Sequence, residues 1–165
     1  MKKFLTTFIY STLAILALGY LFRTMHWEGA QKMLWGGFWL HIASYIGYSF
    51  VVRIKDNRMI YPLIILVLIF ILRFFNIEMS YNVSLISFCV IFLAYIGFHL
   101  LTPNYLAYGE HKPIKIASII LLSFFFIAGV FKVMHLQGAD VILITSVGGI
   151  AFLLMIQGWL KGRAI

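Results

Sequence analysis

The stretch GYLFRTMHWEGAQKML, Gly19–Leu34, occurs a second time in altered form as AGVFKVMHLQGADVIL, Ala128–Leu143. Between them IFILRFFNIEMSYNVSL, Ile69–Leu85, is a more diverged copy of the same pattern. In each copy an apolar run of helical length ends in a basic residue, a short polar turn follows, and a second apolar run begins. An internal repeat decides the architecture before any single motif does. The sequence therefore predicts three copies of one helical hairpin.

The composition indicates that these helices lie in a lipid bilayer. Of the 165 residues 63% are hydrophobic and 11% are charged, which leaves too little polar surface to cover a globule in water. The apolar runs are close in length to a membrane-spanning helix, which needs about 20 residues to cross the hydrocarbon core. They lack the polar–apolar alternation of a porin strand.

The predicted fold is therefore an all-α integral membrane protein, a single membrane domain over residues 1–165. Six transmembrane helices are expected, at approximately Phe4–Phe22, Met33–Val52, Met59–Phe75, Val83–Leu101, Ile116–Phe131 and Val141–Leu160. The three hairpin repeats then cover residues 4–52, 59–101 and 116–160. We expect the first segment to stay in place as a span, because no small-residue cleavage site follows it.

The basic residues predict an orientation. Nine of the 13 Lys and Arg residues fall on the side of the predicted bundle that holds both ends of the chain. By the positive-inside rule both termini are then cytoplasmic and the three turns face outward. The net charge of +8 is accounted for by topology, and no nucleic-acid partner is expected.

The turns have features that end and begin helices. Arg23, Arg73 and Lys132 close the first helix of each repeat, where a cation meets the negative end of the helix dipole. Gly29 and Gly138 can adopt the left-handed conformation that stops a helix. Asp140 is expected to cap the helix that follows it.

An overlay of the three turns aligns several polar side chains. One column holds His26, Asn76 and His135, and a second column, two residues later, holds Glu28, Glu78 and Gln137. If the hairpins pack around a pseudo-threefold axis, these residues share one outer rim that could bind a divalent metal or relay protons. The favoured interpretation is simpler: they are polar turn residues at the level of the lipid headgroups. No metal or cofactor is expected.

His41 stands in the body of the second predicted span, within WGGFWLHIASY. An ionisable residue at that depth should face another helix or water. It could transfer protons, or it could be a neutral imidazole bonded to a neighbouring helix, which is the favoured interpretation. His99, close to the end of the fourth predicted span, is expected at the membrane interface.

Small residues predict where helices approach closely. The candidates are Ala14 with Ala17, Ala43 with Gly47, Ala94 with Gly97, and Thr145 with Gly149. The sequence has no G-x-S-x-G, H-E-x-x-H, C-x-x-C or phosphate-binding glycine loop, so no enzyme activity is expected. The predicted spans hold no acidic residue, which argues against a cation pump.

The repeated segment resembles the membrane hairpin of GldL and PorL, inner-membrane components of the bacterial gliding-motility and type IX secretion motor. The matching residues in the first hairpin are Gly19, Leu21, Phe22, Arg23, His26, Gly29, Met33, Leu34 and Gly37. In the third hairpin they are Gly129, Phe131, Lys132, His135, Gly138 and Leu143. The resemblance implies a bacterial inner-membrane protein. In that family a glutamate of the second helix is implicated in using the proton gradient; here His41 stands at its place, and the long cytoplasmic tail is missing, so motor activity is not carried over.

These observations favour a non-enzymatic inner-membrane protein that is a structural or assembly component of an envelope complex. Its partners would be the lipid bilayer and either a second copy or another membrane protein. One alternative is a conduit or carrier for protons or a small solute, with His41, His26 and His135 as polar stations. Another is a metal-dependent membrane enzyme that uses His26, Glu28, Glu78 and His135.

Overall fold

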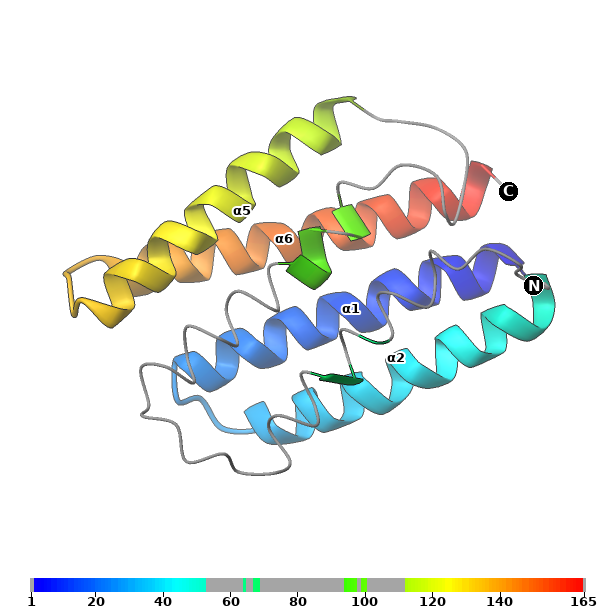
Figure 1. Ribbon diagram of the computed structural model, residues 1–165, viewed down its shortest axis with the longest axis horizontal. Helices are drawn as coiled ribbons and strands as arrows, with labels where there is room; N and C mark the ends of the chain where they lie inside the picture. The colour runs from blue at the N-terminus through cyan, green and yellow to red at the C-terminus, as the bar shows by residue number, and fades with distance from the viewer. Residues whose placement is uncertain are drawn as a thin grey trace.

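The computed structural model describes residues 2–52, 64, 67–68, 94–97, 99–100 and 112–164 (Figure 1). Within these residues the long elements are four helices: α1 (Lys2–Thr24), α2 (Ala30–Val52), α5 (Lys112–Val133) and α6 (Ala139–Ala164). The short stretches at 94–97 and 99–100 are also helical. Most of the third and fourth predicted spans and the turn that holds Arg73, Asn76 and Glu78 lie outside the described residues.

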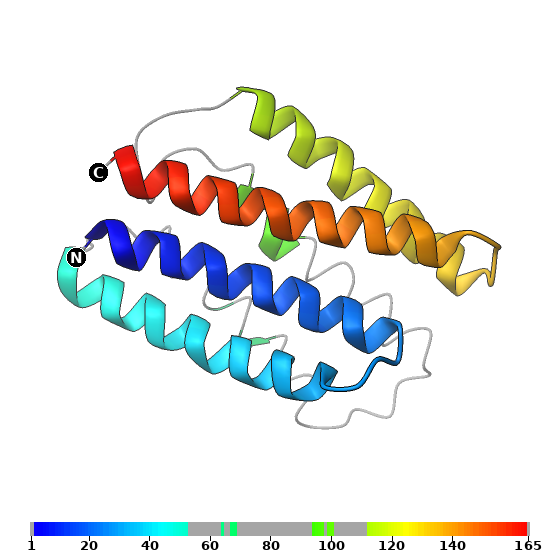
Figure 2. The ribbon, with the colours of Figure 1, turned by 180° about the vertical axis from the view of Figure 1, so that it is seen from behind.

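The four long helices pack side by side in the order α2, α1, α6, α5 (Figures 1 and 2). The α1–α2 and α5–α6 turns lie at one end of this bundle, which we call the turn end. The two chain termini lie at the opposite end, the terminal end. The first and last predicted hairpins therefore lie side by side, with their turns at the same end of the bundle.

Three of these helices are long and apolar enough to cross a membrane: Lys3–Thr24, Lys112–Val133 and Ala139–Lys161. The all-α membrane fold predicted from the sequence is confirmed at this level. The helix α2 has a similar length of 23 residues. It is not among the three, and polar residues, among them His41, Ser44, Ser49 and Gln31 with Lys32, interrupt its apolar sequence. The number of six spans stays a prediction.

Four glycines lie where neighbouring helices approach closely. A Cβ atom on Gly158 of α6 would lie 2.6 Å from Cβ of Tyr10 on α1, and a Cβ on Gly149 would lie 2.9 Å from the Leu121 side chain of α5. Gly19 and Gly37 have the same role between α1 and α2, with nearest atoms at 3.1 and 3.2 Å. Close approach of this kind supplies the van der Waals packing that holds helices together in lipid.

The predicted small-residue contacts are partly confirmed. Ala14 and Ala17 are buried, and Gly149 contacts α5. Ala43 and Thr145 are exposed, so their predicted role in packing is wrong. The sequence pattern places small residues four apart on a helix, but it does not say which of the helix faces is covered.

The two described turns have the same conformation. His26 and His135 adopt φ of 55° and 54°, and Gly29 and Gly138 adopt 82° and 84°. Trp27 N–H donates to Phe22 O at 2.8 Å, and Leu136 N–H donates to Phe131 O at 2.9 Å. A left-handed residue, followed by an N–H that donates to the carbonyl five residues earlier, is the Schellman motif that terminates a helix. Each first helix is thus terminated by a left-handed histidine two residues after its last helical residue.

This conformation corrects two predictions about the turns. The glycines do not stop the first helices, because the histidines do; instead Gly29 O and Gly138 O accept the first bonds of α2 and α6, from Met33 N–H and Ile142 N–H. Asp140 is not the N-cap of α6, because it lies within its first turn. Arg23 and Lys132 are in the last turns of α1 and α5, as predicted.

Candidate functional site

His41 lies at the centre of α2 and is fully buried. Its Nδ1 is 2.8 Å from Oγ1 of Thr12 on α1, and its Nε2 is hydrogen-bonded to the hydroxyl of Tyr95. The side chain therefore faces protein on both sides, and it connects α1, α2 and the helical segment 94–97. Buried polar groups in a bilayer need such partners, because lipid offers none.

The contacts of Thr12 assign the proton of His41. The Thr12 hydroxyl donates its one hydrogen to Ile9 O at 2.8 Å, so toward the imidazole its oxygen accepts. Nδ1 of His41 then carries the proton and donates it. In the neutral ring, which burial in an apolar bundle favours, Nε2 is the acceptor for the Tyr95 hydroxyl. This polarity makes a directed chain from Tyr95 through His41 and Thr12 to the backbone of α1.

A second histidine–tyrosine pair lies beside the first. Nε2 of His99 is 2.9 Å from the hydroxyl of Tyr45, and the ring of His99 lies 4.8 Å from that of Tyr95 and 6.0 Å from that of His41. All four side chains are buried, and we call them the His–Tyr cluster (His41, Tyr45, Tyr95 and His99). His99 was expected at the interface; its contacts with His41, at the middle of α2, show that this prediction is wrong.

The two pairs define a helix direction. His41 bonds Tyr95 and Tyr45 bonds His99, so a step of four residues along α2 matches a step of four residues along 94–100. The two segments are therefore parallel. This is the direction that the alternating topology gives to the fourth predicted span.

The polar contacts continue to the terminal end through Tyr10. The Tyr10 hydroxyl lies 3.4 Å from His99 O, to which it donates, and it accepts from Nζ of Lys161 at 2.8 Å. The Lys161 ammonium is also 5.1 Å from the centre of the Tyr10 ring. Lys161 is only 5% exposed, and within the described part of the chain this cation contacts a hydroxyl and a π face.

Toward the turn end the interior becomes apolar. The buried side chains there include Leu16, Ala17, Leu21, Phe38, Leu143 and Val147. The buried hydroxyls of Thr24 and Ser146 donate to carbonyls of their own helices, Leu21 O and Leu143 O. Among the described residues no buried histidine, lysine or carboxylate lies between His41 and the turns. The polar network therefore occupies the half of the bundle nearest the termini.

The predicted rim residues stand apart from this network. His26, Glu28 and His135 are exposed in the turns, and about 18 Å of helix separates Thr12 from Thr24, next to the first turn. In the described part of the chain no group of three or more histidine, cysteine or acidic side chains could hold a metal ion. Glu78 lies outside the described residues. Both turn histidines instead have a conformational role at the left-handed position.

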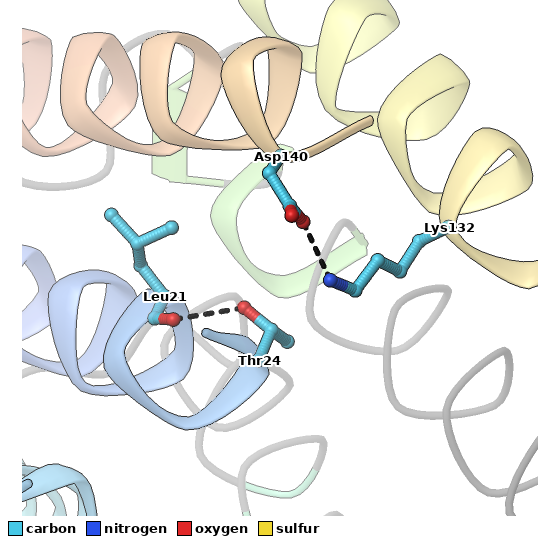
Figure 3. A network of polar contacts seen from close by, with 4 residues as sticks. All are labelled: Leu21, Thr24, Lys132 and Asp140. Carbon is cyan, nitrogen blue, oxygen red and sulfur yellow. Dashed lines mark hydrogen bonds and ion pairs between the residues drawn. The ribbon is translucent and has the colours of Figure 1, made fainter. Parts of the chain in front are cut away.

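One ion pair fastens the α5–α6 turn. Nζ of Lys132 is 2.5 Å from Oδ1 of Asp140, and the two side chains point toward one another beside the end of α1 (Figure 3). The lysine is at the negative end of α5 and the aspartate at the positive end of α6, so each charge also suits its helix dipole. Both side chains are partly exposed, and a pair of this kind contributes about 0–1 kcal/mol.

Sequence reasoning found His41 but missed Tyr10, Tyr45, Tyr95 and Lys161. Tyrosine is usually interpreted as an apolar or interfacial residue in a membrane sequence. Lys161 was interpreted only as one of the basic residues that determine the orientation in the membrane. A signal was present: His41 and Tyr45, and Tyr95 and His99, are each four residues apart, which places each pair on one helix face.

No family model, curated protein or solved structure matches this chain. The resemblance to GldL and PorL therefore stays a prediction from the sequence.

Proposed function

We propose that this chain is a non-enzymatic structural or assembly component of a bacterial inner-membrane complex. One observation carries the proposal: both ring nitrogens of His41 are bonded to side chains of other segments, Thr12 and Tyr95. A histidine held in this way connects helices, and the bundle becomes a rigid unit whose outer surface is left for contacts. Interhelical bonds of this type are a recognised source of stability in lipid.

The proposed topology has six spans in three hairpins with both termini in the cytoplasm. It is supported by the distribution of Lys and Arg, by the position of both termini at one end of the bundle, and by the shared conformation of the two described turns. The resemblance to the GldL and PorL hairpin supports a location in the bacterial inner membrane. The turn histidine of that hairpin, His26 in the first copy and His135 in the third, terminates a helix in both described copies, so its role there is structural.

A proton conduit is the second candidate. It is favoured by the buried polar contacts from Lys161 to the Tyr10 hydroxyl and on to the backbone carbonyl of His99, whose side chain belongs to the His–Tyr cluster. A conduit must also cross the other half of the bundle, where the described interior is apolar. Among the described residues that half holds no buried histidine, lysine or carboxylate, and its buried hydroxyls, those of Thr24 and Ser146, donate to carbonyls of their own helices, so we prefer the structural role. The metal-dependent enzyme has less support, because the described rim residues do not form a ligand group.

Reconstitution in liposomes separates the two candidates. The purified chain is expected to give no proton flux above that of empty vesicles under an imposed potential, whereas an added protonophore gives full flux in both. His41→Ala should lower the free energy of unfolding in detergent by about 2–4 kcal/mol, because it leaves a cavity and an unpaired Tyr95 hydroxyl. Tyr95→Phe should cost about 1 kcal/mol.

Flux that depends on His41 would reject the structural role in favour of the conduit. The assembly proposal also expects a co-purifying membrane partner or a stable homo-oligomer in mild detergent. Ser49→Ala is the control for stability, because Ser49 is exposed and its hydroxyl bonds only its own helix. It should change the free energy of unfolding by less than about 0.5 kcal/mol.

A further inference from the structure

The helix α5 carries an apolar groove beside the segment 94–97, where Leu122 lies 3.8 Å from the position of a Cβ on Gly97. It is lined by Ile119, Leu122, Ser123, Phe126 and Ile127 and has a volume of about 460 Å³. Of the three membrane-capable helices α5 is the least covered by protein, with 17% of its apolar stretch buried against 61% for α1. The Ser123 hydroxyl donates to Ile119 O. The surface of the groove is therefore apolar, and an apolar ligand would fit it.

Two lysines stand at one end of this groove. Lys112 and Lys115 are exposed in the first turn of α5. At 3.6 residues per turn they fall on the same face as Ile119, Ser123 and Phe126, whereas the buried residues Ser118, Phe125 and Ala128 fall on the opposite face. The sequence of α5 contains no acidic residue. The face is thus basic at its start and apolar along its length.

We propose that this face binds one anionic phospholipid, with its phosphate at Lys112 and Lys115 and an acyl chain in the groove. The lengths agree with this arrangement. From Ile119 to Ile127 the helix rises by about 12 Å, and one leaflet of the hydrocarbon core is about 15 Å thick. The groove therefore fits within one leaflet, while Lys115 and Lys112, about one and two turns before Ile119, reach the headgroups.

The charge of this end of the bundle agrees as well. Lys112 and Lys115 belong to the more basic, terminal end, which the proposed topology places in the cytoplasm. Anionic lipids attract basic residues near the membrane surface, and each lysine there strengthens binding about fivefold. The site is independent of whether the bundle has a structural role or conducts protons, because the groove and the His–Tyr cluster share no residue.

Native mass spectrometry of the full chain, released from detergent with equal amounts of phosphatidylglycerol and phosphatidylcholine, tests the site. The wild type is expected to retain one phosphatidylglycerol in preference. Lys112→Gln with Lys115→Gln should weaken that binding about thirtyfold and leave phosphatidylcholine unchanged. Lys3→Gln with Lys32→Gln, which removes the same charge elsewhere, should change it less than about twofold.

A second pair of variants tests the groove. Ser123→Trp should fill it and abolish the preferred lipid, whereas Ile120→Trp, exposed on α5 outside the lining, should not. Equal retention of both lipids by the wild type, an equal loss in the control lysine pair, or a dimer without lipid would overturn the proposal. Circular dichroism checks that each variant keeps its helices; if Ser123→Trp loses them, the lysine variants alone decide.

Discussion

The histidines of this chain illustrate how one residue type has two unrelated uses. His26 and His135 occupy the left-handed region at the ends of α1 and α5, where a side chain is tolerated at a cost and glycine is more usual. His41 and His99 are buried and bonded to tyrosines. From the sequence alone the four positions cannot be told apart, because each is simply a histidine. Burial and backbone angle distinguish the two uses.

Replacement of His26 tests the conformational role. An L-residue in the left-handed region costs about 1–2 kcal/mol, so His26→Gly should not lower the free energy of unfolding, and a gain of up to about 1 kcal/mol is expected. His26→Val should lower it by about 1–2 kcal/mol, because a branched residue is strained at this φ. Thermal or denaturant unfolding in detergent, followed by circular dichroism, measures both.

Lys32→Val is the matched control for His26→Val. It introduces the same side chain at an exposed position of α2 with ordinary helical angles, and should cost about 0.5 kcal/mol. If His26→Gly were as destabilising as His26→Val, the contacts of the imidazole, and not its backbone angle, would explain why histidine stands there.

At the scale of the helices, the interface of α1 with α6 depends on close approach. The Thr7 hydroxyl of α1 lies 3.1 Å from both Lys3 O of its own helix and Gly158 O of α6, between which it shares its hydrogen, and Tyr10 lies directly over Gly158. A methyl group at Gly158 would meet the Tyr10 Cβ, which cannot move without its backbone. The contact therefore fixes the distance between the two helices that hold Tyr10 and Lys161.

Gly158→Ala should lower the free energy of unfolding by about 1–3 kcal/mol, the usual cost of an overpacked contact. The loss occurs although alanine has the higher helix propensity by about 1 kcal/mol. Gly148→Ala is the matched control, because nothing lies within 4 Å of a Cβ there, and it should stabilise the protein. Unfolding in the same detergent measures both, and equal effects of the two substitutions would contradict the packing shown here.

The sequence predicted the helices well and their partners poorly. The four described helices match predicted spans within a few residues; α1, for example, was expected at Phe4–Phe22 and is Lys2–Thr24. Apolar runs and their charged ends determine such bounds locally. The partner of His41 depends on which helix face meets which neighbour, and Tyr95 lies 54 residues away. Nothing local specifies that contact, so the His–Tyr cluster could not be derived from spacing alone.

For the whole molecule, polarity is distributed unevenly between the two ends. The His–Tyr cluster, Tyr10 and Lys161 occupy the half near the termini, whereas the described interior of the other half is mostly apolar and holds no buried histidine, lysine or carboxylate. Most of the Lys and Arg residues lie on the terminal side of the predicted spans. The end with the buried polar network is thus also the end that the positive-inside rule assigns to the cytoplasm.

Cysteine labelling in intact cells tests this orientation. In a Cys89→Ser background, cysteines replacing Glu28 and Gln137 in the turns should react with a membrane-impermeant maleimide from outside. Cysteines replacing Lys3 and Lys112 should react only after permeabilisation, because the cytoplasmic side retains the greater number of basic residues near the span ends. Labelling of Lys3→Cys from outside together with Glu28→Cys from inside would invert the topology. It would also move the lysines of α5 away from the cytoplasmic leaflet, so this one measurement tests the orientation and the leaflet of the lipid site together.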